Sequence, residues 1–149
     1  MSDDISESGS SVSVPSWYWV AAIAALLFEC LGCFFYLAEV QLTPEQIAML
    51  PLDQAAMLTA RPAWYYAAFG TAVWVGLAGT VGLLLRKRWA VPALLISLVG
   101  VVVQFSAVFI VPDMRNVTSD ALLGPIIVFV VCYGIYMLAR LARRRGWLR

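Results

Sequence analysis

Polar side chains that could do chemistry are scarce in the apolar part of this chain, and Glu29 is the most informative of them. It lies in the segment Trp17–Ala38, which contains no other charged residue. A charged group is costly in lipid, so a carboxyl in such a segment marks a candidate site for a proton, a cation or a ligand. The alternative is a carboxyl kept neutral by burial, which only donates a hydrogen bond to Gln104 on a neighbouring helix.

The depth of Glu29 can be compared with that of Gln104 if both segments are helices that cross a membrane. Glu29 lies twelve residues after Trp17, or about 18 Å along a helix. Gln104 lies fourteen residues after Ala90, or about 21 Å. Two more polar residues reach this layer from the opposite direction. The predicted intramembrane polar site consists of Glu29, Gln104, Tyr133 and Thr71.

The three cysteines indicate neither redox chemistry nor a metal site. Cys30 and Cys33 form a C-x-x-C pair in the middle of an apolar segment, whereas reactive pairs need an electropositive, partly exposed setting. Cys132 could join them, but the chain has no histidine. This removes the usual partner ligand of cysteine metal sites, bis-histidine haem ligation and histidine-dependent catalytic triads. We therefore expect no metal, no cofactor, no catalytic residue and no enzymatic activity.

Four apolar segments carry these residues, and each is long enough to cross a bilayer as a helix. The composition is 62% hydrophobic and only 13% charged, with a mean hydropathy of +0.85. Such a chain has too little polar surface for a soluble domain. The predicted fold is all-α, a membrane-embedded antiparallel bundle of four helices over residues 17–38, 64–85, 90–111 and 122–141.

The connection between the first two spans is long enough to form structure of its own. Thr43 to Gln46 has the form of a capping box, with Pro44 in the first helical turn. We expect one or two short helices there, lying on the outer membrane face, broken at Pro51 and ended before Pro62.

Small residues line one side of the second span. They let helix backbones approach closely, which is the main route to packing in lipid. We expect this span to be the central packing helix, or the surface for a partner. The predicted helix-packing residues are Ala72, Gly76, Gly79, Thr80 and Gly82.

The basic residues are distributed asymmetrically. Eight of ten lie in residues 86–88 and 140–149, so the positive-inside rule places these segments and both termini in the cytoplasm. The predicted organisation is a disordered cytoplasmic tail (1–16), the four-helix domain (17–141) and a basic cytoplasmic tail (142–149). Aromatic residues at the span ends, among them Tyr65 and Trp147, are expected to be interfacial anchors.

Most of the chain after the N-terminal tail resembles a known group of proteins. The segments Phe28–Leu37, Pro62–Phe105 and Gly124–Arg149 are similar to those of small four-span bacterial membrane proteins, some of which are labelled sugar transporters. The resemblance implies a multi-pass protein of the bacterial inner membrane and transfers no site residues. The chain also lacks the Pro-Gln pair of small sugar-transporting three-span repeats.

Three function classes follow, in order of preference. The first is an accessory subunit of a larger membrane assembly, which needs only apolar helices and a small-residue face. The second is an oligomeric transporter or channel for a small solute or proton that uses the Glu29–Gln104 layer. The third is a membrane enzyme, for which no nucleophile–base pair is found. The expected partners are membrane lipids and other subunits or a second copy. Nucleic acid is not expected, because membrane orientation already accounts for the basic residues.

Overall fold

The computed structural model describes residues 12–115 and 119–149, and the side chains of 119–121 are not considered. Most of the segment expected to be a disordered tail, residues 1–11, lies outside the described part of the chain. Within that part the protein is all-α, as predicted.

Four long helices account for the predicted spans, and each is long and apolar enough to cross a membrane. They agree with the expected segments to within three residues at each end. The elements are α1 (Ser16–Val40), α2 (Pro44–Ala48), α3 (Leu52–Thr59), α4 (Ala63–Leu84), α5 (Ala90–Ile110), η1 (Pro112–Met114) and α6 (Ser119–Arg144). These helices support the assignment of a multi-pass membrane protein.

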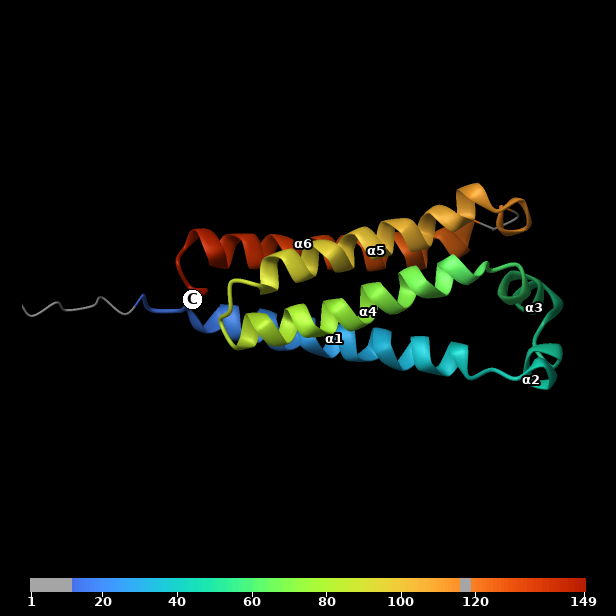
Figure 1. Ribbon diagram of the computed structural model, residues 1–149, viewed down its shortest axis with the longest axis horizontal. Coiled ribbons are helices and arrows are strands. Elements are labelled where there is room, and N and C mark those ends of the chain that lie inside the picture. The colour runs from blue at the N-terminus through green and yellow to red at the C-terminus, as the bar shows by residue number, and fades with distance from the viewer. Residues whose placement is uncertain (1–11, 116–118) are drawn as a thin grey trace, which may run out of the picture.

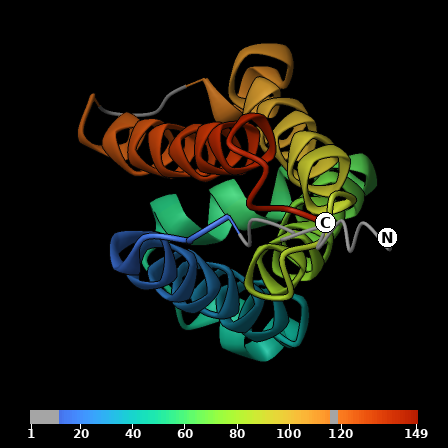
Figure 2. The ribbon, with the colours of Figure 1, turned by 90° about the vertical axis from the view of Figure 1, so that its left-hand side faces the viewer.

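The long helices run side by side along one axis and alternate in direction (Figure 1). Seen from one end, they occupy four corners in the order α1, α4, α5 and α6 (Figure 2). Helix α4 packs against both α1 and α5, and α6 packs mainly against α5. We call the end with the 85–89 turn and residues 145–149 the basic end. The opposite end, with α2, α3 and η1, is the connector end.

The connector end contains the two short helices predicted from the sequence. The Thr43 backbone N–H donates to Gln46 Oε1 at 2.9 Å, and the Gln46 N–H donates to Thr43 Oγ1 at 3.3 Å. This is the expected capping box, with Pro44 in the first turn of α2. Pro51 separates α2 from α3, and α3 ends at Thr59, before Pro62, as expected.

The predicted helix-packing residues of α4 are all buried and allow the close approach of α5: Ala72, Gly76, Gly79, Thr80 and Gly82. A Cβ added to Gly79 would lie 2.7 Å from Leu94 Cγ, and one added to Gly82 would lie 3.1 Å from Ala90 Cβ. On the facing helix, a Cβ at Gly100 would lie 3.1 Å from the Ala68 carbonyl oxygen. Backbones this close cannot accommodate larger side chains, which explains the sequence of this interface.

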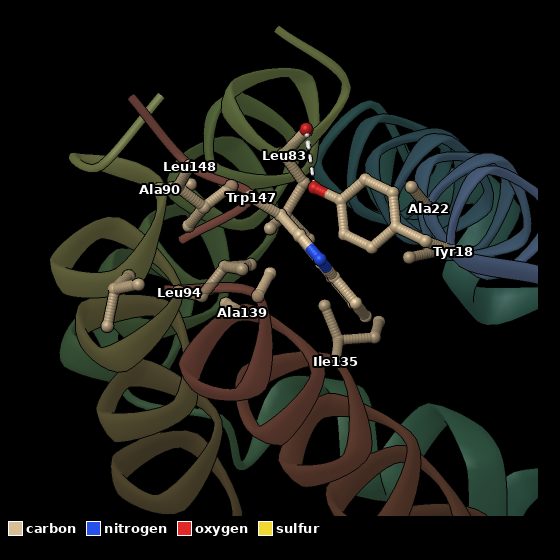
Figure 3. Close-up of a cluster of buried hydrophobic side chains, with 12 residues drawn as sticks. Tyr18, Ala22, Leu83, Ala90, Leu94, Ile135, Ala139, Trp147 and Leu148 are labelled. Atoms are coloured by element: carbon tan, nitrogen blue, oxygen red, sulfur yellow. Dashed lines mark hydrogen bonds between the residues drawn. The ribbon is translucent and has the colours of Figure 1, made fainter. Parts of the chain in front are cut away.

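Residues 145–149, which belong to the predicted basic tail (142–149), are folded against the basic end. Helix α6 continues to Arg144, and Gly146, with φ +70°, reverses the chain. Trp147 is only 7% exposed. Its ring lies between Tyr18 and Ile135 (Figure 3). Trp147 is therefore a core residue of this end, and the expectation that it is an interfacial anchor was wrong.

Hydrogen bonds from the 85–89 turn hold this returning segment in place. The Arg88 N–H donates to the Arg149 carbonyl at 3.1 Å, and Arg86 Nε donates to the Trp147 carbonyl at 2.7 Å. The Tyr18 hydroxyl donates to the Leu83 carbonyl at 2.8 Å, which ties α1 to the end of α4 (Figure 3). The result is a packed aromatic and aliphatic plug, made of Tyr18, Leu83, Ile135, Trp147 and Leu148, that we call the basic-end plug.

Candidate functional site

A cavity of about 270 Å³ lies between the four long helices, all of which line it, and the exposed Leu31 and Phe35 form part of its wall. Its polar wall consists of Glu29 from α1, Ser97 and Gln104 from α5, and Cys132 from α6. The remaining wall is apolar and includes Phe28, Phe35, Phe69, Val101, Phe105 and Val128. The cavity therefore combines one carboxyl with hydrogen-bonding groups in an otherwise hydrophobic chamber.

Glu29 is 4% exposed, and its carboxyl lies against Gly76 of α4. A Cβ at Gly76 would collide with this carboxyl and would lie 2.7 Å from Ser97 Oγ. The glycine thus provides the space that the carboxyl occupies. Residue 76 was predicted to serve helix packing, and the structure places it beside the candidate site as well.

No residue in the described part of the chain donates a hydrogen bond to the Glu29 carboxyl. The nearby Ser97 hydroxyl donates instead to the Ala72 carbonyl, at 2.6 Å. Buried polar groups are nearly always hydrogen-bonded, so a carboxyl that lines a cavity without a donor is suited to receive one from a bound species. A proton, a cation or a solute with N–H or O–H groups would supply it.

Gln104 lies on the same cavity and leads towards the connector end. It is 5% exposed, and its Nε2 donates to the Tyr65 hydroxyl at 3.1 Å. The Arg61 guanidinium lies over the Tyr65 ring, with its Cζ 4.8 Å from the ring centroid, and forms an ion pair with Glu39. We call Glu39, Arg61, Tyr65 and Gln104 the polar row.

The ion pair at the start of the polar row is a fixed charge pair. Burial alone lowers the pKa of the Arg61 guanidinium, but the hydrogen bond to Glu39 and the neighbouring Tyr65 outweigh burial and raise the pKa above its ordinary value. Arg61 therefore stays protonated at any physiological pH, and its charge cannot itself be the group that titrates.

Polar groups do not continue from the cavity to the basic end in the same way. Four polar residues are buried in the described part of the chain. Three of them line the cavity, and the fourth is Thr80. Its hydroxyl donates to the Leu77 carbonyl of its own helix at 2.9 Å. Beyond it lies the basic-end plug. The cavity is thus connected to the connector end by polar side chains and is separated from the basic end by packed apolar ones.

The structure brings together two of the four residues predicted for the site. Glu29 and Gln104 line one cavity, as their similar depth suggested. Tyr133 is 48% exposed and stacks on Phe129, and Thr71 is exposed with its hydroxyl donating to the Ala67 carbonyl at 2.8 Å. Tyr133 and Thr71 were placed by depth alone, without the helix rotation that decides which way a side chain faces.

That rotation can be read from their neighbours. Tyr133 follows Cys132, which lines the cavity, and Thr71 precedes Ala72, which is buried. One residue along a helix turns the side chain by about 100°. Both residues therefore face away from the site although they lie at the right depth.

Sequence reasoning missed three participants in the site. Ser97 lies seven residues before Gln104, and this spacing is about two helical turns, so helical periodicity could have found it. Tyr65 was taken for an interfacial anchor because it belongs to an aromatic run, and its partner Gln104 could not be seen. Arg61 pairs with Glu39 across 22 residues, which no local pattern reveals.

The cysteines are in the thiol form and do not form a metal site within the described residues. Cys33 is buried, and its thiol donates to the Val73 carbonyl at 3.6 Å. Cys30 is exposed on α1. Cys132 alone reaches the cavity.

The chain was compared with protein-family models, with curated proteins and with solved structures. None of the three comparisons found a match. The functional assignment therefore depends on the geometry of the chain itself.

Proposed function

We propose that this protein is a small membrane transporter that binds a proton or a small cationic solute at Glu29. The observation that supports this proposal is the unpartnered, 4% exposed carboxyl of Glu29 on the wall of a cavity between the four long helices. Ionisable groups inside a membrane bundle are rare and mark sites such as ion pathways and proton relays. The proposal includes no catalytic step.

The polar row indicates from which end of the bundle a proton or solute reaches the cavity. It runs from the Glu39–Arg61 ion pair through Tyr65 to Gln104 on the cavity wall. Hydroxyl and amide groups can exchange hydrogen bonds with a passing water or proton. In the basic-end plug the Tyr18 hydroxyl is already committed to the Leu83 carbonyl, and the side chains around it are packed apolar groups. We therefore assign entry to the connector end, with the described conformation closed at the basic end.

Release on the other side requires a second conformation in which the basic-end plug separates. The cavity and the plug share Phe28, which lines the first and packs against the second. Occupation of the cavity can thus act on the plug through direct contact. Alternating access of this type needs two packed arrangements of the same helices, not a permanent pore.

Reconstituted vesicles with an internal pH-sensitive dye test the proposal. Wild type should pass protons under an imposed membrane potential, and Glu29→Gln should fall to the level of empty vesicles, because the amide keeps the shape but loses the titratable proton. Glu45→Gln is the matched control, since Glu45 is an exposed carboxyl on α2. Equal flux in wild type and Glu29→Gln, with both proteins inserted and folded, would refute a role for this carboxyl in transport.

The accessory-subunit role is the second candidate, and one observation favours it. An apolar cleft of about 520 Å³ lies between α5 and α6, lined among others by Phe105, Phe109, Pro125 and Phe129. Large exposed apolar patches mark protein or lipid contacts. Co-purification of a defined membrane partner, lost on Phe109→Ser but kept by Glu29→Gln, would support this role over transport.

A further inference from the structure

A second cleft lies at the basic end, outside the bundle interior, and its chemistry differs from that of the Glu29 cavity. It has a volume of about 630 Å³ and lies between the start of α5 and the last turns of α6. Val91, Pro92 and Leu95 form one wall, and Tyr136 with three arginines forms the other. The cleft does not contribute to the site described above.

The three arginines are Arg140, Arg143 and Arg144, and all are exposed. Together with Tyr136 they lie at spacings of three and four residues, which places them on one face of α6. Arg140 Cζ lies 5.8 Å from the Tyr136 ring centroid, so the ring holds this guanidinium over the cleft. Within residues 12–115 and 119–149, no carboxylate forms an ion pair with any of the three.

The arginine wall of the cleft suits an anionic group, and the apolar wall suits an alkyl chain. Guanidinium groups bind phosphate oxygens through paired hydrogen bonds, and three of them favour an anionic group strongly. Val91 and Leu95 lie one helical turn apart at the start of α5, where an alkyl chain could lie along the helix. A soluble anion would use only the arginine wall, whereas a lipid uses both.

We propose that this cleft binds an anionic phospholipid, with its phosphate on Arg140, Arg143 and Arg144 and an acyl chain along Val91 and Leu95. The site would hold a lipid at the α5–α6 contact, next to the basic-end plug. Basic clefts between membrane helices are the usual setting for such headgroups. This proposal does not depend on the transport proposal, because it involves neither Glu29 nor the polar row.

The test uses the full chain, purified in neutral detergent and titrated with dioleoyl-phosphatidylglycerol or with dioleoyl-phosphatidylcholine. Native mass spectrometry counts the retained lipids. Wild type should retain phosphatidylglycerol at least fivefold more than phosphatidylcholine, and 0.5 M salt should reduce this preference because it screens the charges. Equal retention of the two lipids would overturn the proposal.

The first variant is Arg140→Gln/Arg143→Gln/Arg144→Gln, with Lys87→Gln/Arg88→Gln/Arg145→Gln as its control. The control removes the same charge from exposed residues of the same end, outside the cleft lining. We expect at least a fivefold loss of phosphatidylglycerol retention in the first and less than a twofold change in the second. Equal losses would show a diffuse attraction to the whole basic end and would overturn a defined site.

Two further measurements separate the remaining explanations. Leu95→Trp fills the apolar part of the cleft without changing charge, so it should lower phosphatidylglycerol retention even if the arginine variant does not fold. Unchanged retention in a folded Leu95→Trp protein would exclude the acyl-chain position. Complete displacement of the lipid by 10 mM inorganic phosphate would identify a site for a free anion and would also overturn the proposal.

Discussion

The Gln104 side-chain amide donates to the Tyr65 hydroxyl at 3.1 Å and joins α5 to α4 inside the bundle. The accepted bond leaves the phenolic proton of Tyr65 free to be donated elsewhere. The pair lies between the Glu29 cavity and Arg61, whose guanidinium covers the Tyr65 ring. It is therefore the link of the polar row that could control passage between the connector end and the cavity.

Replacing Tyr65 by Phe should remove this link and keep the ring. Gln104 would lose its acceptor, at a cost to stability of about 1 kcal/mol, and proton flux in vesicles should drop by roughly tenfold. The control is Tyr133→Phe, which removes a hydroxyl from a tyrosine that faces outwards. If the two variants conduct equally, the polar row does not contribute to transport.

The close packing around Gly76 can be tested by comparison with Gly134, which has no neighbouring atoms in the space that a Cβ would fill. In Gly76→Ala the new methyl group would meet the Glu29 carboxyl and Ser97, so it should destabilise the folded protein by about 1–3 kcal/mol, as overpacking does. Gly134→Ala on α6 is the control, because a Cβ there meets nothing within 4 Å. Its higher helix propensity should leave stability unchanged or slightly increased. Equal melting temperatures of both variants and wild type in detergent would contradict the observed packing.

The Glu39–Arg61 ion pair can be measured by a double-mutant cycle. Each side chain is about one-fifth exposed or less (20% and 16%), so Glu39→Gln and Arg61→Gln should each lower the free energy of unfolding by about 1–3 kcal/mol. The double variant should lose less than the sum of the two. Additive losses would mean that the two side chains do not stabilise each other.

The pH dependence of the Arg61 contribution has a definite sign. The folded-state pKa of Arg61 is raised above the unfolded value, so its stabilisation is complete below the unfolded pKa and is lost only as pH rises through the folded one. Both values lie far above neutrality. The difference in unfolding free energy between wild type and Arg61→Gln should therefore show no contribution from Arg61 titration between pH 6 and pH 9. A difference that shrinks with rising pH in this range would show that Arg61 loses its proton there.

The orientation predicted by the basic residues can be tested with an impermeant maleimide on intact cells. In a background without native cysteines, Met49→Cys should be labelled from outside, because Met49 is 86% exposed at the connector end. Lys87→Cys in the turn at the basic end should be labelled only after the cells are opened. The reverse pattern would place the basic end outside and would move the proposed entry to the other side of the membrane.

The four long helices and the two short ones could be predicted because their signals are local. Apolar length defines the spans, and the Thr43 capping box with Pro51 and Pro62 defines the connector helices. The depth of Glu29 and Gln104 was also predictable, because the rise per residue of a helix is constant. Their place on the wall of one cavity follows from the packing of both α1 and α5 against α4, which the glycines of α4 permit.

The errors concern rotation and long-range contacts. Tyr133 was predicted to belong to the site because of its depth in the membrane. Its neighbour Cys132 lines the cavity, so the Tyr133 side chain points outwards. Trp147 has the residue type and the position of an interfacial anchor, and only the chain reversal at Gly146 brings it into the core. Such a contact depends on where the end of α6 meets the start of α1, more than a hundred residues away in the chain.

The fold-back of residues 145–149 also makes the packing of the basic end depend on the chain that follows α6. Helices α1, α4 and α5 precede α6 in the chain, and their glycine-lined contacts can form while α6 is still being synthesised. The basic-end plug cannot form around Tyr18 until Trp147 has been synthesised and the Arg88 N–H has bonded to the Arg149 carbonyl. Closure of the basic end thus follows the synthesis of α6, and a quality-control protease that recognises an uncovered Tyr18 would distinguish chains that have folded back from chains that have not.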